Sequence, residues 1–247
     1  MNGSSIPRAV TFDYWNTLCY EESPSWIERQ RVANVVAVLA ARGVELPAER
    51  IEDAARVGRA AHHSAWLENR QFDARAVAAR YVETLADLLP ADDALHAELR
   101  DAFAATPENL EIPLVPGVRD VLQQLDAAGI ALGIICDVGL TPSTVLRANL
   151  DRHDVLRHFT HWSFSDEVGT YKPDPRIFGH ALTGLDARPE DAWHVGDLRR
   201  TDIAGAQAFG MRAARVTVIH DDTDDANGPS GDVVVSDYRE LPTALGL

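Results

Sequence analysis

The order of hydrophobic and polar residues changes character along the chain. Residues 10–13 form a short apolar run that ends in aspartate, which is typical of a buried strand. From residue 25 to about residue 106, apolar residues instead recur at helical spacing, as at Leu95, Leu99 and Phe103. Four segments with this spacing follow one another, so the pattern predicts four amphipathic helices that pack as a bundle.

After residue 113 the pattern becomes an alternation of short apolar runs and helical segments. The runs with the character of strands are "IALGIICD", "HFTHWSFS", "DAWHVGD", "AARVTVI" and "VVVSD". Strands that alternate with helices favour a parallel sheet with helices on both faces. The predicted fold is therefore α/β, a doubly wound parallel-sheet (Rossmann-like) core that is interrupted after its first strand by an inserted α-helical bundle. We place the core domain in residues 1–19 and 111–247, and the inserted domain in residues 20–110.

Charged residues stand where several predicted strands end. Asp13 ends the first strand, and Asp197 ends the run "AWHVGD". Cys136 and Asp137 together end the run "IALGIICD". Ligands of open α/β sheets bind beyond the carboxyl ends of the strands. A single aspartate at such a point is usually a helix cap or a turn residue, but the whole set favours a functional site. It also includes Lys172, in the loop "GTYKPDP", and Asp202, in the turn after Asp197.

Lysine occurs at one position only, Lys172, although lysine and arginine together number 23. A compact, point-like ammonium group suits an anion in a confined site. The alternative is chance in a composition that is biased toward arginine. If Lys172 is functional, it is a candidate to bind an anionic group of a substrate.

The overall composition narrows the classes of partner. The formal net charge of −15 argues against nucleic acid and anionic membranes, both of which favour basic surfaces. No apolar run approaches the roughly 20 residues of a membrane helix, and residues 1–8 do not resemble a signal peptide. Two cysteines do not make a disulfide framework, so a reducing cytoplasm is the expected location. A small anionic substrate would need a local positive site in this acidic protein.

Four segments, in order, resemble the motifs of the haloacid dehalogenase (HAD) superfamily of hydrolases. They are "TFDYWNTL", "GIICD", "GTYKPDPRIF" and "HVGDLRRTDIAGAQAFGM". The third is similar to the lysine motif of the family, and the fourth is similar to its GDxxxxD motif. The helical insert also lies where the family carries its cap domain. The resemblance implies the same core fold and hydrolysis through a covalent aspartyl intermediate.

The resemblance further implies a role for each matching residue. Asp13 is expected to be the nucleophile, supported by Thr17 in the same loop. Lys172 is expected to neutralise both the nucleophile and the group that is transferred. These roles agree with the physics, because a carboxylate attacks an anionic phosphoryl group poorly unless cations offset the repulsion. The ligands implied for Mg²⁺ are Asp13, Asp197, the backbone carbonyl of Trp15 and, directly or indirectly, Asp202.

The sequence departs from the family pattern at two motifs. The family's phosphatases carry a proton-transferring aspartate two residues after the nucleophile, but here that residue is Trp15, whose indole is neither acid nor base at neutral pH. General acid–base catalysis is worth about 10²–10⁴ in rate. Its loss favours leaving groups that need no proton, or requires a substitute. In the second, phosphate-binding motif, Cys136 replaces a hydroxyl donor, and Asp137 either substitutes for the base or caps the next helix.

The leading prediction is a Mg²⁺-dependent hydrolase, similar to a phosphatase, that acts on a small phosphorylated metabolite as a monomer or a homodimer. One alternative is a 2-haloacid dehalogenase, because that branch carries tyrosine at the position of Trp15 and releases halide without a proton. Asp197 and Asp202 argue against it, since adjacent carboxylates favour a metal that those enzymes do not need. The phosphonatase branch is excluded because the insert has no lysine to form a Schiff base. A second alternative is a HAD protein that binds metal and ligand but turns over slowly or not at all.

Two further segments are less informative. His62, His63 and Trp66 lie on one predicted helix, where they either line a substrate pocket or belong to a solvated face and the bundle core. The acidic loop of residues 221–225 lacks the oxygen spacing and the glycine turn of calcium-binding loops. We therefore predict that this loop is solvated.

Overall fold

The computed structural model describes residues 6–22, 26–106 and 110–247. Contacts within the chain divide it into two compact units, which are described separately. The core unit comprises Met1–Glu22, Glu111–Asp137 and Leu146–Leu247, and the helical unit comprises Ser23–Leu110 and Val138–Val145. The helical unit thus includes a segment, Val138–Val145, that the sequence analysis assigned to the core domain.

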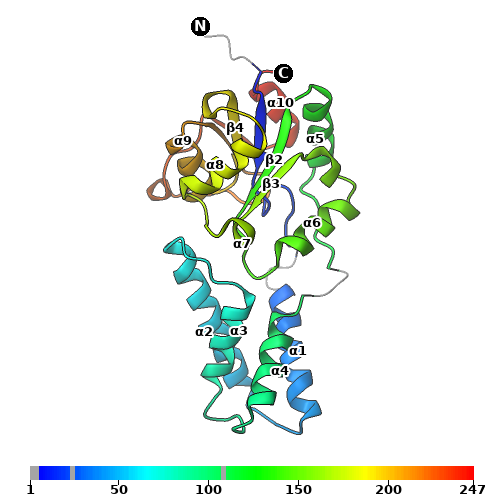
Figure 1. Ribbon diagram of the computed structural model, residues 1–247, viewed down its shortest axis with the longest axis vertical. Helices are drawn as coiled ribbons and strands as arrows, with labels where there is room; N and C mark the ends of the chain where they lie inside the picture. Colours follow the sequence, from blue (N-terminus) through cyan, green and yellow to red (C-terminus); the bar gives the residue numbers. More distant parts are fainter. Residues whose placement is uncertain (1–5, 23–25, 107–109) are drawn as a thin grey trace. The chain divides into compact units, whose positions relative to one another are not determined.

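Six parallel strands form a single sheet in the core unit (Figure 1). In chain order they are β1 (Ala9–Phe12), β2 (Ala131–Cys136), β3 (His161–Phe164), β4 (Ala192–Gly196), β5 (Arg212–Val216) and β6 (Val233–Val235). Their order in the sheet is β3-β2-β1-β4-β5-β6, so β1 lies between β2 and β4. The direction of strand addition reverses between β1 and β4, and ligands of doubly wound sheets bind at such a point. The predicted doubly wound α/β core is confirmed.

Helices flank both faces of this sheet. Figure 1 shows α5 (Val118–Ala127) and α6 (Ser143–Arg152) on one side, with α8 (Pro175–Gly184) and α9 (Ala204–Ala208) on the other. Two shorter helices are α7 (Ser165–Val168) and α10 (Leu241–Ala244). The remaining turns of helix are η1 (Leu156–His158), η2 (Pro189–Asp191), η3 (Arg199–Ile203), η4 (Asp225–Asn227) and η5 (Tyr238–Glu240), of which η3 is a π-helix.

Local sequence explains why α8 begins directly after the lysine loop. The side chain of Asp174 accepts a hydrogen bond from the amide of Arg176, and proline follows at the first helical position. The buried face of the helix then packs against strand residues of the core. Its members are Ile177, Phe178, Ala181 and Leu182. Lys172 is therefore attached to a helix that the sheet holds in place.

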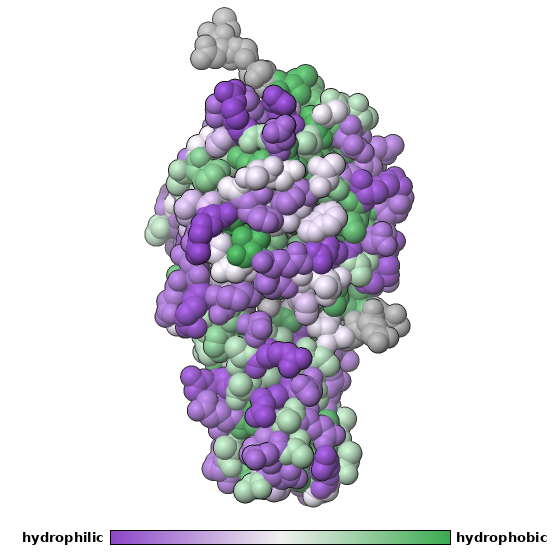
Figure 2. Space-filling view, in the orientation of Figure 1, coloured by the Kyte–Doolittle hydropathy of each residue, from purple (hydrophilic) through white to green (hydrophobic). Residues whose placement is uncertain are grey.

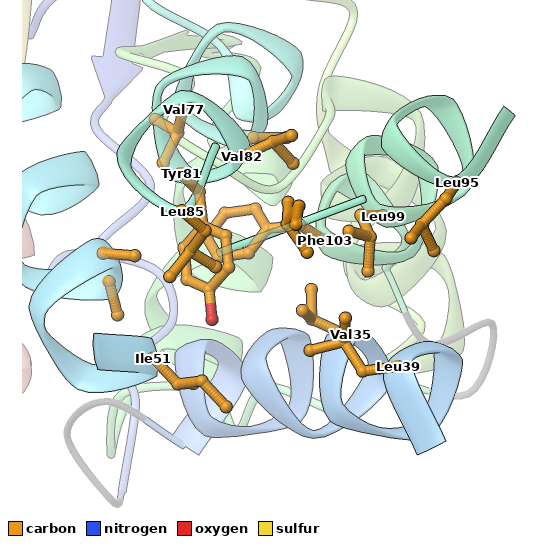
Figure 3. Close-up of a cluster of buried hydrophobic side chains, with 14 residues drawn as sticks. Val35, Leu39, Ile51, Val77, Tyr81, Val82, Leu85, Leu95, Leu99 and Phe103 are labelled. Carbon is orange, nitrogen blue, oxygen red and sulfur yellow. The ribbon is translucent and has the colours of Figure 1, made fainter. Parts of the chain in front are cut away.

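The helical unit contains the predicted bundle. Its helices are α1 (Trp26–Ala41), α2 (Ala48–Leu67), α3 (Ala74–Thr84) and α4 (Asp93–Ala104). Their apolar side chains meet in one cluster, in which the rings of Tyr81 and Phe103 lie 4.9 Å apart between centroids (Figure 3). Trp66 was a candidate for this core, but it is only half-buried, and its ring lies 5.8 Å from the ring of His63, which is exposed. The helical repeat of Leu95, Leu99 and Phe103 is buried, as its spacing predicts.

A buried arginine explains why the segment Val138–Val145 belongs to the helical unit. Arg31 of α1 is fully buried and donates hydrogen bonds to the carbonyls of Phe103, Ala104 and Ala105 at the end of α4. The last carbonyls of a helix lack partners within the helix, and a cation there is favourable. The same guanidinium donates to the carbonyl of Leu140 at 2.6 Å. Arg31 therefore ties two helices of the bundle to the segment that follows β2.

The visible surface is mostly polar. In Figure 2 hydrophilic residues predominate on the face shown, with apolar residues scattered among them. Within residues 6–22, 26–106 and 110–247, no helix combines the length and the apolar character needed to cross a membrane.

Candidate active site

Three carboxylates meet where β1 and β4 end. Asp13 follows β1 and Asp197 follows β4, and Phe12 of β1 pairs with Val195 of β4, so the two strand ends are adjacent. Asp202 joins them from the π-helix η3. Ligand oxygens of the three aspartates all lie within 4.8 Å of one another, and all three side chains are buried. The structure thus brings together the three acidic residues that the sequence singled out as metal ligands.

Lys172 bridges two of these carboxylates. Its Nζ donates to Asp13 Oδ1 at 2.5 Å, to Asp202 Oδ1 at 2.7 Å and to the Ile135 carbonyl at 3.0 Å. The lysine side chain is only 1% exposed. Burial by itself would lower the pKa of Lys172, but Asp13 and Asp202 raise it well above its usual value. The residue is therefore an ammonium ion that is held by three oxygen atoms.

The two carboxylates that share Lys172 differ in their acidity. Burial raises the pKa of Asp13 well above its usual value, and Lys172 offsets this only in part because Asp202 and Asp197 add their negative charge. Burial would also raise the pKa of Asp202, but Lys172 and His194 outweigh it and lower that pKa. One ammonium among three carboxylates leaves the site with excess negative charge, which a bound cation would offset.

Asp202 has both carboxylate oxygens engaged by the protein. Its Oδ2 accepts from the Leu198 amide at 2.9 Å, while Oδ1 lies 3.2 Å from His194 Nε2 in addition to Lys172. Burial lowers the pKa of His194, so the ring is neutral and its Nε2–H donates to Asp202. Gly196 permits this close packing, because a Cβ there would lie 2.3 Å from Asp202 Cγ.

The role of His194 was not predicted from the sequence, although one signal was present. The residue interrupts the otherwise apolar run "AWHV" of β4, and all of its strand neighbours are buried. Its Nδ1 lies 2.8 Å from Thr11 Oγ1 on β1. Because Nε2 carries the proton, Thr11 donates to Nδ1. A buried histidine with a partner at each nitrogen positions Asp202.

Asp197 receives two donors on one oxygen. Its Oδ2 accepts from Asn16 Nδ2 at 3.2 Å and lies 3.0 Å from His220 Nδ1. Burial raises the pKa of Asp197, and the hydrogen bond from His220 acts in the opposite direction. That hydrogen bond raises the pKa of His220. Neither Asn16 nor His220 was predicted to contact Asp197. Asn16 lies in the turn after β1 and His220 in the loop after β5, and both segments are distant from Asp197 in sequence.

The turn after Asp13 contains the unusual residue of the first motif. Trp15 is half-buried, and its ring meets that of Tyr14 edge-on at 5.2 Å. The Asn16 amide donates to the Cys19 carbonyl at 2.7 Å, which closes the turn. Within the described part of the chain, the backbone carbonyl of Trp15 accepts no backbone hydrogen bond. This carbonyl is therefore available as an oxygen ligand.

Thr17 supports this turn through its backbone. Its carbonyl accepts a hydrogen bond from the hydroxyl of Tyr238, a residue near the carboxyl terminus that sequence analysis did not identify. The side-chain hydroxyl of Thr17 is buried and has no hydrogen-bond partner among the described residues. A buried hydroxyl without a hydrogen-bond partner destabilises the folded protein. A ligand that accepted a hydrogen bond from this hydroxyl would remove that cost.

The second motif places a thiol and a carboxylate beside this cluster. Cys136 ends β2 and is fully buried, and burial raises the pKa of its thiol well above the usual value. It is therefore a neutral thiol. Asp137 accepts a hydrogen bond from the Lys172 amide at 2.8 Å. The carboxylate that sequence analysis assigned either to proton transfer or to a helix cap thus helps to hold the lysine loop.

Comparisons with known proteins agree with the four sequence motifs. The chain is 34% identical over 150 residues to phosphoserine phosphatase of Thermus thermophilus, which covers 61% of this chain and 57% of that protein. It is 39% identical over 100 residues to glyceraldehyde 3-phosphate phosphatase of Pyrococcus furiosus, which covers 40% of each. These matches therefore span only about half of each relative's length.

The fold and the family follow from two broader matches. The structure resembles that of 2-haloacid dehalogenase from Pseudomonas syringae pv. Tomato with a TM-score of 0.66 over 97% of this chain and 98% of that one. At 24% sequence identity this likeness establishes the fold alone. The sequence profile of haloacid dehalogenase-like hydrolases matches residues 7–210, which contain the first three motifs and all but the last residue of the fourth. This chain therefore belongs to the haloacid dehalogenase-like hydrolase family.

Proposed function

We propose that this protein is a Mg²⁺-dependent phosphatase that hydrolyses a small phosphorylated metabolite through an aspartyl-phosphate at Asp13. The observation that carries the proposal is the buried cluster in which one lysine bridges two of three adjacent carboxylates. Relatives named phosphoserine phosphatase and glyceraldehyde 3-phosphate phosphatase support the same reaction class.

The donor set fits magnesium. Mg²⁺ prefers hard oxygen ligands and is commonly held by one or two carboxylates together with substrate phosphate. Among the described residues, no hydrogen-bond donor contacts Asp13 Oδ2 or Asp197 Oδ1. These two oxygens and the Trp15 carbonyl would hold the ion, which would supply positive charge to the phosphoryl oxygens. Asp202 would act indirectly, because protein donors already occupy both of its oxygens.

Residues of the chain supply the nucleophile and hold it in position. An oxygen of Asp13 attacks phosphorus, the bond to the leaving oxygen breaks, and a water molecule later cleaves the aspartyl-phosphate. Lys172 Nζ donates a hydrogen bond to Asp13 Oδ1 at 2.5 Å. Its positive charge offsets negative charge on the transferring group. Asp202 and the Ile135 carbonyl fix the lysine, and Asp137 fixes its backbone. The nucleophile is thus oriented before a substrate arrives.

Trp15 limits the leaving groups that depart easily. An indole cannot protonate a leaving alkoxide, and a general acid is worth about 10²–10⁴ in rate. We therefore expect acyl phosphates, and phosphate esters of acidic alcohols, to react faster than alkyl phosphates. The same residue also keeps carbon–halogen hydrolysis as a second candidate, because halide leaves without a proton. The carboxylate cluster favours phosphoryl transfer over that alternative, since a cation is needed to balance its charge.

A substrate panel tests this proposal. Phosphate monoesters, acyl phosphates and 2-chloroacids would be assayed with Mg²⁺ and with a chelator, using the wild type and Asp13→Asn. We expect Mg²⁺-dependent phosphate release that is lost in Asp13→Asn. Chloride release that needs no metal would identify a dehalogenase instead. Mg²⁺ binding without turnover of any compound would identify the protein as a binding-only member of the family.

A further inference from the structure

The most specific unexplained feature of the core unit is the pair of donors on Asp197 Oδ2. Asn16 reaches this oxygen from the turn after β1, and His220 reaches it from the loop after β5. The two donors stand more than 200 positions apart in the chain yet converge on one atom. The other oxygen, Oδ1, receives no hydrogen bond from any described residue.

The loop that carries His220 is anchored on the side that follows the histidine. Asp221 pairs with Arg215 of β5 at 2.5 Å. Asp222 accepts from the Arg199 amide at 2.9 Å, and its carbonyl accepts from Arg199 Nε at 2.7 Å. Asp222 is only 7% exposed, so the prediction of a solvated loop is wrong at this residue. These contacts fix the backbone next to His220 and thereby its approach to Asp197.

The backbone of Asn16 is also fixed in position. Its backbone lies in the left-handed region, with φ of +56°, which asparagine tolerates better than most residues. Its amide bond to the Cys19 carbonyl closes the turn. The side chain is thus directed from a closed turn that begins immediately after Asp13 and Trp15.

Two donors on one oxygen restrict rotation of the carboxylate. We propose that Asn16 and His220 are positioning residues that hold Asp197 with Oδ1 presented to a divalent cation. The inference rests on the proposed metal-dependent function. It does not depend on the charge of His220, because a ring with a proton on Nδ1 donates in either state. Partners that orient a metal-binding side chain typically contribute about 10–100-fold to metal affinity.

The test is the affinity of the purified full chain for Mg²⁺, measured by isothermal titration calorimetry. We expect Asn16→Gly, which suits the left-handed turn but lacks the donor, and His220→Ala each to weaken binding by about tenfold. His220→Asn places an amide nitrogen near the position of Nδ1 and is expected to restore affinity. His220→Gln places it near the position of Nε2 and is expected to remain weak.

Another histidine–carboxylate pair provides the control. His158 Nδ1 lies 2.7 Å from Asp126 in the same unit, outside the carboxylate cluster, so His158→Asn is expected to bind Mg²⁺ as the wild type does. Circular dichroism and thermal melts would establish that each variant is folded. The affinities of the five variants together support positioning, because a general loss of structure would not distinguish His220→Asn from His220→Gln.

The outcomes separate this inference from the proposed function. Wild-type affinity in both Asn16→Gly and His220→Ala overturns the positioning role and leaves the phosphatase proposal intact. The expected affinity pattern in a protein that hydrolyses no phosphate supports positioning and overturns the phosphatase proposal. Absence of Mg²⁺ binding in the wild type overturns both.

Discussion

Each unit of this protein contains a cation that is no more than 1% exposed, Lys172 or Arg31, but the two cations have different partners. Lys172 in the core unit donates to two carboxylates and one carbonyl. Arg31 in the helical unit donates to carbonyls and to the Thr106 hydroxyl, with no carboxylate among its partners in the described chain. Burial lowers the pKa of Arg31 to about 10, whereas the carboxylates raise that of Lys172.

This difference agrees with a structural role for Arg31 and with the catalytic role that we propose for Lys172. Arg31 satisfies the carbonyls that end α4, so its partners are neutral and permanent. Lys172 lies among carboxylates that outnumber it, which leaves charge to be balanced by a ligand. Arg31 and Lys172 are thus equally buried, but the charge of their hydrogen-bond partners distinguishes the two sites.

The largest expected effect is the loss of activity on removal of the lysine charge. Lys172→Met leaves three buried carboxylates without their ammonium, and we expect turnover of the best phosphate substrate to fall by about 10²–10³. Lys172→Arg is expected to recover little, because a guanidinium is larger and planar. Steady-state rates with saturating Mg²⁺ measure both. Retention of a tenth of wild-type turnover in Lys172→Met would contradict the chemical role.

The matching change in the helical unit is expected to affect stability. Arg31→Met leaves several buried carbonyls without a donor, and we expect the free energy of unfolding to fall by about 3 kcal/mol. Urea denaturation followed by circular dichroism measures this loss. Arg31→Lys keeps the charge but has fewer donors, so its free energy of unfolding is expected to lie between those of the wild type and Arg31→Met. A change below about 0.5 kcal/mol in Arg31→Met would show that these hydrogen bonds contribute little.

Two buried glycines extend the comparison to packing. A Cβ at Gly196 would lie 2.3 Å from Asp202 Cγ, whereas one at Gly58 in α2 would lie 3.0 Å from Val77 Cγ1. We expect Gly196→Ala to cost about 2 kcal/mol in stability and to impair turnover, because Asp202 is held by several donors. Gly58→Ala is expected to stay within about 1 kcal/mol of the wild type, since alanine favours helix. Equal losses of stability would show that the site packs no more tightly than the bundle.

The smallest expected effect is a difference in pH dependence. The pKa of Asp13 is raised above its usual 3.8, so the folded protein takes up this proton at a higher pH than the unfolded chain does. Wild-type stability should therefore rise relative to Asp13→Asn as pH falls from 8 to 5 in the presence of a chelator. The difference between wild type and Arg31→Met should stay constant, because the carbonyl partners do not titrate. A wild-type curve parallel to that of Asp13→Asn would show that Asp13 keeps its ordinary pKa.

Much of the molecule could be predicted from local pattern. Helical spacing located the bundle, and short apolar runs located all six strands of the sheet. Parallel strands end at one edge, so the positions of Asp13 and Asp197 in sequence were enough to predict that they meet. The four motifs in their order are enough to indicate the family.

The contacts that prepare the site could not be predicted in the same way. His194, Asn16 and His220 each hold an aspartate, but none follows a spacing rule that relates it to its partner. Arg31 gave no sign that it would bind the segment after β2, because its partners there are backbone carbonyls. Such contacts depend on how distant segments pack, which local pattern does not encode.

The sequence by itself determined which residues reach the edge of the sheet, because strand and helix periodicity and the order of motifs are local properties. Only the tertiary structure decided which oxygen of each carboxylate is already occupied. Asp202 has both oxygens engaged, while Asp13 and Asp197 each keep one that accepts no hydrogen bond from a described residue. The physical reason is that a hydrogen bond requires a donor within about 3 Å, and folding brings those donors from segments far apart in the chain.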